Sequence, residues 1–134
     1  MKKFIVIAFM LLGFGNSVHA ASAPAPTQWI ISHIGSTSGD KPYVWDSVQF
    51  SSSTHWNHEG EIHAVVQVNG YSNPVVTYNN SAMQLIETSG IDTNNDGYYD
   101  VWMYHYVSYG PSGNVVVKDW INGVFAIRDT VYVQ

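Results

Sequence analysis

The segment from Asp92 to Asp100 has the residue types and the spacing of a calcium-binding loop. Calcium takes about six to eight oxygen ligands, and alternate side chains of a tight loop point toward one ion. A glycine at the sixth position permits the reversal of the chain around the metal. We therefore expect calcium to be bound by the side chains of Asp92, Asn94, Asp96 and Asp100 and by the carbonyl of Tyr98.

Two features separate this loop from an EF-hand. The twelfth position is Met103, where an EF-hand has a bidentate glutamate. The following segment, 99–109, is aromatic and β-branched, which predicts a strand rather than a helix. The pattern thus indicates a hairpin-borne site that braces a chain without cysteine. The alternative is a turn of Asn, Asp and Gly that holds no metal.

A second group of candidate metal ligands lies between His55 and His63. Imidazole and carboxylate groups together bind zinc or copper. This suggests a second metal site made by His55, His58, Glu61 and His63, and with it a small metal-dependent enzyme as an alternative function. The spacing matches no established zinc pattern, so the other interpretation is a set of solvated polar residues before a strand. His105 is expected to be a partly buried, hydrogen-bonded histidine.

Aromatic residues near predicted turns are candidates for ligand binding. The chain has five tryptophans and nine tyrosines, most of which should pack in the core or pair across strands. Trp56, Tyr71 and Tyr99 instead lie in or beside turns, where their rings can stack on the face of a sugar. We therefore expect carbohydrate as the favoured ligand, bound by these three residues.

The elements that must position these residues are short strands separated by turn signals. Strands are predicted at 29–34, 43–50, 61–68, 75–78, 83–88, 99–109, 115–120 and 124–133. Asn69-Gly70 and Asn122-Gly123 each predict a hairpin. A helix at 81–87, with Ser81 and Gln84 as a capping box, is the competing interpretation of that segment. The pattern predicts an all-β fold, a small single-domain antiparallel β-sandwich or a partly open barrel.

The N-terminus has the features of a bacterial secretory signal. Residues 1–20 combine two lysines, a short apolar run and small residues before a cleavage point after Ala20. Residues 21–26 then form a leader rich in proline and alanine, and 27–134 a single domain. We expect the product to be secreted or periplasmic, with no membrane span in the mature protein.

Charge narrows the choice of partners. The mature chain would keep three basic residues, Lys41, Lys118 and Arg128, against ten acidic residues, a formal net charge of −7. Nucleic acid and anionic lipid require basic surface, so neither is an expected partner. The charge does favour the binding of cations.

Both ends of the mature chain resemble a known family. Ser22-Ala-Pro-Ala-Pro26 precedes a predicted strand and Gly35-Ser-Thr-Ser-Gly39, and the chain ends Ile127-Arg-Asp-Thr-Val-Tyr-Val-Gln134. In these segments it is similar to the YolA-like family of small secreted bacterial proteins. The resemblance implies secretion and one β-rich domain, and it transfers no activity and no catalytic residue. We expect a protein that binds rather than catalyses, with a secreted protein-binding effector or inhibitor as a further alternative.

Overall fold

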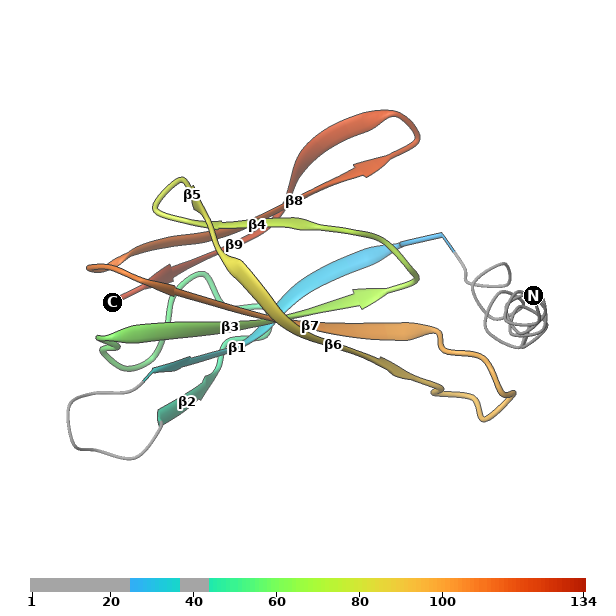
Figure 1. The fold of residues 1–134 in the computed structure, drawn as a ribbon, viewed down its shortest axis with the longest axis horizontal. Helices are drawn as coiled ribbons and strands as arrows, with labels where there is room; N and C mark the ends of the chain where they lie inside the picture. Colours follow the sequence, from blue (N-terminus) through green and yellow to red (C-terminus); the bar gives the residue numbers. More distant parts are fainter. Residues whose placement is uncertain (1–24, 37–43) are drawn as a thin grey trace, which may run out of the picture.

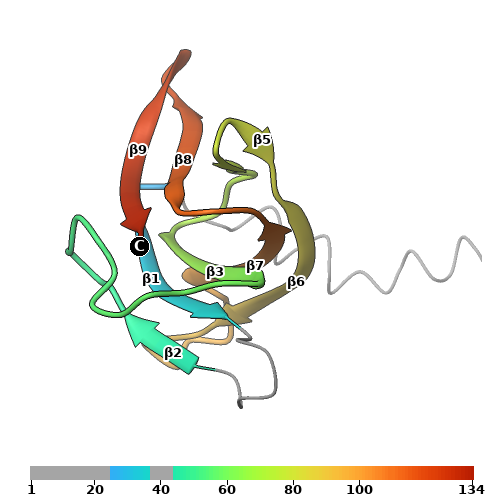
Figure 2. The ribbon, with the colours of Figure 1, turned by 90° about the vertical axis from the view of Figure 1, so that its left-hand side faces the viewer.

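A computed structural model describes residues 25–36 and 44–134 of the chain. These residues form two antiparallel β-sheets that pack face to face, which confirms the predicted β-sandwich (Figures 1 and 2). The strands are β1 (Gln28–Ser36), β2 (Val44–Ser47), β3 (Glu61–Asn69), β4 (Val75–Tyr78), β5 (Ser81–Ala82), β6 (Gln84–Ile91), β7 (Val101–Tyr109), β8 (Gly113–Ile121) and β9 (Val124–Val133). The predicted signal, most of the leader and the segment 37–43 lie outside the described residues.

The larger sheet has the strand order β2-β1-β3-β7-β6, and the smaller sheet has the order β5-β4-β8-β9. β3 is the central strand of the larger sheet, where it pairs with β7 along its whole length and with β1 over residues 62–69. Residues 62, 64, 66 and 68 of β3 are fully buried, whereas 61, 63, 67 and 69 are partly exposed. The alternation shows that one face of this sheet packs on the core while the other faces solvent.

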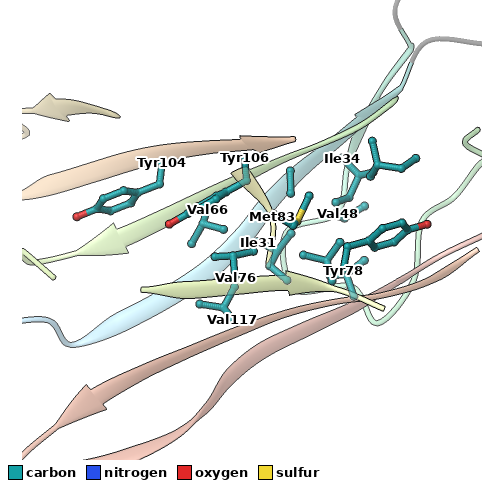
Figure 3. Close-up of a cluster of buried hydrophobic side chains, with 14 of the residues drawn as sticks. Ile31, Ile34, Val48, Val66, Val76, Tyr78, Met83, Tyr104, Tyr106 and Val117 are labelled. Atoms are coloured by element: carbon teal, nitrogen blue, oxygen red, sulfur yellow. The ribbon is translucent and has the colours of Figure 1, made fainter. Parts of the chain in front are cut away.

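The core consists of aliphatic and tyrosine side chains from both sheets (Figure 3). Ile31 and Val66 extend from the larger sheet toward Val76 and Val117 of the smaller one, and all four are almost completely buried. The β-branched residues that favour strands therefore also fill the space between the sheets.

Buried polar groups add directional contacts between the sheets. The indole nitrogen of Trp29 in β1 donates to Asp119 in β8 over 2.7 Å, and the Ser72 hydroxyl donates to the same carboxylate over 2.5 Å. The Ile31 amide donates to Asp129 of β9 over 2.7 Å. These bonds fix the relative position of the two sheets, because leaving such groups unpaired inside the protein costs about 1–3 kcal/mol each.

Most predicted strands are confirmed to within a few residues, and the hairpin at Asn122-Gly123 is confirmed between β8 and β9. Of the strand predicted at 43–50, residues 44–47 form β2 and residue 43 lies outside the described residues, whereas 48–50 leave the strand because the chain turns at Phe50, which has a φ of 63°. The helix predicted as an alternative at 81–87 is wrong, since these residues lie in β5 and β6. β6 forms because it pairs with β7.

The hairpin predicted at Asn69-Gly70 is also wrong. The Asn69 carbonyl accepts the Thr27 amide over 2.8 Å, and the Gly70 amide donates to the Asp100 carbonyl over 2.9 Å. Both backbone groups are thus used by neighbouring segments. The chain continues from β3 into β4 of the other sheet instead of returning beside β3.

Candidate functional site

The Asp92–Asp100 loop connects β6 and β7 at the right-hand end of the molecule in Figure 1. Its side-chain oxygens lie against three consecutive amides. The Asp96 amide donates to Asp92 Oδ1 over 3.1 Å and to Asn94 Oδ1 over 3.2 Å. The Gly97 amide donates to Asp92 Oδ2 over 2.7 Å, and the Tyr98 amide donates to Asp96 Oδ1 over 2.9 Å. Gly97 has a φ of 93°, which a side chain would disfavour.

Asp100 has a different role from the other loop residues. Its carboxylate accepts the Thr93 amide over 2.9 Å and the Thr93 hydroxyl over 2.5 Å. The hydroxyl bond, followed by the amide bond, lowers the pKa of Asp100. The Asp100 amide also donates to the Ile91 carbonyl over 3.0 Å. Asp100 therefore closes the base of the loop.

The loop has oxygen atoms that a cation could use. Each carboxylate or amide oxygen has two lone pairs, so one amide bond leaves a second pair free. Within the described residues, no three Asp, Glu or His side chains are grouped as metal ligands. An ion at this loop would therefore depend on the Asn94 amide oxygen and the Tyr98 carbonyl as well as on Asp92 and Asp96.

An aromatic platform, defined here as Tyr71, Tyr99 and Trp102, lies beside the loop. Tyr71 and Tyr99 each contact the Trp102 ring edge to face, with centroids 5.1 and 5.4 Å away. The tyrosine rings are 46% and 48% exposed, so this is an aromatic surface open to solvent. The platform includes two of the three ligand-binding residues predicted from the sequence.

Trp102 and Gly90 explain the arrangement of the platform. Gly90 of β6 pairs with Trp102 of β7, and a Cβ atom at Gly90 would lie only 2.3 Å from the Tyr99 ring. The Tyr99 ring therefore covers the space that the glycine leaves. The indole nitrogen of Trp102 is buried and has no hydrogen-bond acceptor within the described part of the chain.

Trp56, the third predicted ring, lies at the other end of the sandwich. Its amide donates to Asp46 of β2 over 3.1 Å, and Asp46 pairs with Ile34 near the end of β1. The platform lies near the opposite end of β1, where Gln28 pairs with Asn69. The structure thus does not bring Trp56 together with Tyr71 and Tyr99.

The four residues proposed as a second metal site fall into two separate groups. Asp46, which is completely buried, accepts the His55 amide and His55 Nδ1, each over 2.7 Å. His58 Nε2 lies 3.4 Å from the same carboxylate, and His58 Nδ1 lies 2.8 Å from the Ser36 hydroxyl. Burial alone would raise the pKa of Asp46, but the hydrogen bonds from His55, Trp56 and His58 outweigh it and lower the pKa.

This arrangement of Ser36, His58 and Asp46 has the connectivity of a hydrolytic triad, but it is closed to solvent. Ser36 is 1% exposed and His58 is 6% exposed. A nucleophile must reach its substrate, so these contacts are better explained as a buried polar network in which every member has a partner. We call these three residues, together with the exposed His55 that is bonded to Asp46, the Asp46 network.

Glu61 and His63 point away from the Asp46 network, on the solvent face of the larger sheet. The Tyr109 hydroxyl donates to Glu61 over 2.9 Å, and His63 Nε2 lies 3.1 Å from His105 Nδ1. Within the described residues the predicted four-residue site therefore has no common centre. The expectation for His105, a partly buried histidine in a hydrogen bond, is confirmed.

Comparison with known proteins gives a family. Residues 21–130 match the family described as "Domain of unknown function (DUF4879)". The chain belongs to this family. No curated protein and no solved structure matches the chain. The DUF4879 match covers the whole sandwich apart from the end of β9, and it assigns no activity to it.

Sequence reasoning missed several residues of these sites in the DUF4879 chain. Asp46 and Ser36 carry no local signal, because their partners are about ten to twenty positions away in an irregular loop. Trp102 appeared to be one strand aromatic among many. The pairing of His63 with His105 could have been found only from the register of β3 with β7. A helix able to cross a membrane does not occur in the part of the chain that the structure describes.

Proposed function

We propose that the protein is a secreted, non-catalytic binding domain that holds a carbohydrate on the aromatic platform. Calcium in the Asp92–Asp100 loop would brace that platform. The observation that carries the proposal is the platform itself: two exposed tyrosines flank a tryptophan whose indole N–H finds no acceptor among the described residues.

Carbohydrate suits this surface for two reasons. Aromatic rings offer large, rigid area to the C–H face of a sugar, and each exposed ring here is about half accessible. The unpaired indole N–H of Trp102 costs about 1–3 kcal/mol while it is buried without a partner. A sugar hydroxyl that displaced one tyrosine edge would accept this hydrogen bond and remove the cost.

The connections of Asp100 support a bracing role for calcium. Tyr99 precedes Asp100 directly in the chain, and Gly70, which precedes Tyr71, donates its amide to the Asp100 carbonyl over 2.9 Å. Both tyrosines of the platform are therefore attached to the residue that closes the loop. An ion that orders the loop would also fix the separation of the two rings.

The calcium part is tested by thermal unfolding with and without the ion. Calcium at a hundred times its dissociation constant should stabilise the fold by about 2.7 kcal/mol, and Asp92→Ala with Asp96→Ala should abolish the gain. Glu87→Gln, an acidic residue on another surface, is the matched control and should keep it. An unchanged melting temperature in the wild type would show that the loop is a turn without metal.

The carbohydrate part is tested on a glycan array. Tyr99→Ala and Tyr71→Ala should each remove the signal, whereas Trp56→Ala should retain it because this ring lies at the other end of the sandwich. Chelation of calcium should weaken the signal if the loop braces the platform. An array that stays blank in calcium would reject carbohydrate as the ligand.

A protein-binding effector is the second candidate, and one observation favours it. The β8–β9 hairpin projects beyond the rest of the smaller sheet (Figure 2), and its Trp120, Val124 and Phe125 are 59%, 58% and 40% exposed. Apolar groups gathered on a surface mark interaction sites. Binding of the labelled protein to cells distinguishes the candidates, because glycosidase treatment would abolish carbohydrate binding and protease treatment would abolish protein binding.

The metal-dependent enzyme predicted at 55–63 is not favoured. Its histidines divide between a buried network and a sheet surface, and the described residues show no shared centre for them.

A further inference from the structure

The solvent face of the larger sheet contains a pair of histidines in direct contact. His63 lies on β3 and His105 on β7, and the rings meet diagonally across the strand pair because His63 is opposite Val107 and His105 is opposite Val65. His63 Nε2 and His105 Nδ1 are 3.1 Å apart, and both side chains are partly exposed. Neither residue belongs to the loop or the platform of the proposed function.

We propose that His63 and His105 form a two-histidine site for a divalent late transition metal, with Cu(II) bound most tightly. A metal is bound by imidazole nitrogen at about 2.0–2.1 Å. Two nitrogens 3.1 Å apart then subtend about 100° at the metal. This angle lies between the right angle of square-planar or octahedral coordination and the tetrahedral angle, so the pair accepts the metal without rearranging the strands.

The facing nitrogens of the two imidazoles can both turn a lone pair toward one metal ion. Burial, and after it the neighbouring His105, lowers the pKa of His63, while Glu61 and Glu87 oppose this effect. The net effect is a lowered pKa of His63. In the metal-free protein one of the two facing nitrogens carries a proton and donates it to the other. When the metal binds, this proton moves to the other nitrogen of the same ring, and the metal takes its place between the rings. Each ring then presents one nitrogen lone pair to the metal.

Carboxylates on the same face add negative charge beside the pair. Glu87 of β6 is opposite His105 in the register, so their side chains leave the same face of the sheet. Glu61 is two residues before His63 on β3 and shares its face. The negative charges of Glu61 and Glu87 each act to raise the pKa of His63, and the same charges favour a cation beside this ring. Water completes the coordination. Cu(II) is preferred over Ni(II) and Zn(II) because affinities at nitrogen sites follow that order.

Trp45 provides a spectroscopic reporter. Its ring contacts His63 edge to face with centroids 4.8 Å apart, whereas its distance from His33 is 6.4 Å. A paramagnetic Cu(II) ion held by His63 should therefore quench Trp45 fluorescence strongly. Trp45→Phe should remove most of the quenching while Cu(II) binding, measured by calorimetry, continues.

The test is a titration of the folded protein with Cu(II) in a non-coordinating buffer. Wild type should bind one ion with saturable quenching, and excess calcium should not displace it. His63→Gln and His105→Gln should each weaken binding at least about tenfold, because even the loss of an outer-shell partner of a metal costs that much. His33→Gln is the matched control, a histidine on the same face that is bonded to Ser32, and it should bind as wild type does.

Two results would overturn the site. One is undiminished binding in both His63→Gln and His105→Gln, and the other is an equal loss in His33→Gln. Circular dichroism checks that each variant is folded, and electron paramagnetic resonance of the wild type gives an independent measurement. Two coordinated imidazole nitrogens support the site, while one or none rejects it.

Discussion

The two ends of the sandwich use polar and aromatic residues in opposite ways. At the Asp46 network the buried carboxylate of Asp46 is bonded to His55, Trp56 and His58, although His55 itself is exposed. At the aromatic platform the two tyrosines are exposed, and the Trp102 indole N–H has no acceptor in the part of the chain that the structure describes. A fully satisfied network stabilises a fold, whereas an open surface with an unpaired donor leaves free energy for a ligand to gain. The histidines that cluster in the sequence therefore divide between the Asp46 network and the solvent face of the larger sheet.

Asp46→Ala tests the end of the sandwich that contains the Asp46 network, and it should have the largest effect on stability. The change removes the acceptor of two partly buried amides, those of His55 and Trp56, and the partner of the buried His58, so we expect a loss of about 3 kcal/mol in the free energy of unfolding. Denaturation with urea measures it. Asp92→Ala in calcium-free buffer is the comparison, and it should cost about 1 kcal/mol or less because its partners are exposed to water. Equal losses of stability in the two variants would show that the two ends of the sandwich do not differ in this way.

The pH dependence of stability examines the same carboxylate without removing its atoms. The folded pKa of Asp46 is below its ordinary value of 3.8. The ionised Asp46 therefore contributes fully to the stability of the fold above pH 3.8, and this contribution is lost as the pH falls through its folded pKa. The melting temperature of wild type should decrease more steeply below about pH 4 than that of Asp46→Asn. If the melting temperatures of the two proteins fell in parallel with pH, the lowered pKa of Asp46 would not contribute to stability.

The sequence predicted the sandwich well because its signals are local. Alternating β-branched residues and the Asn122-Gly123 turn determine where strands begin and end. The same turn chemistry failed at Asn69-Gly70, because the outcome there depends on Thr27 and Asp100, which are distant in the chain. Strand periodicity also did not predict that nearly all residues of β6 are exposed. This exposure follows from the position of β6 at the edge of the sheet.

The candidate sites were predicted only where their residues are contiguous. The loop from Asp92 to Asp100 is one segment, so its oxygens could be identified from spacing alone. The partner of His63 is His105, 42 residues later, and the partner of His55, which lies in a loop, is Asp46 of β2. Contacts of this kind depend on sheet register, which the sequence did not specify for these strands.

Gly90→Ala alters the platform without changing any of its rings. The new methyl group would lie 2.3 Å from the Tyr99 ring, so this exposed side chain must move away from Trp102. Such overpacking costs about 1–2 kcal/mol, and we expect weaker carbohydrate binding together with altered tryptophan fluorescence. Ser89→Ala, the preceding residue of β6, is the control and should change neither property. Normal binding in Gly90→Ala would show that the position of Tyr99 is irrelevant to the ligand.

The smallest effect on stability is expected at the projecting hairpin. Trp120 and Phe125 pair with each other across β8 and β9, with ring centroids 5.1 Å apart, and both remain exposed. Replacing both with serine should change the free energy of unfolding by about 0.5 kcal/mol, as at other surface positions. The same variant should lose protease-sensitive binding to cells if the hairpin docks on a protein, and it should keep all binding if the platform alone holds the ligand. A large loss of stability would instead mean that these two rings stabilise the sandwich. The hairpin would then have a structural role, like the Asp46 network, and not a role in binding.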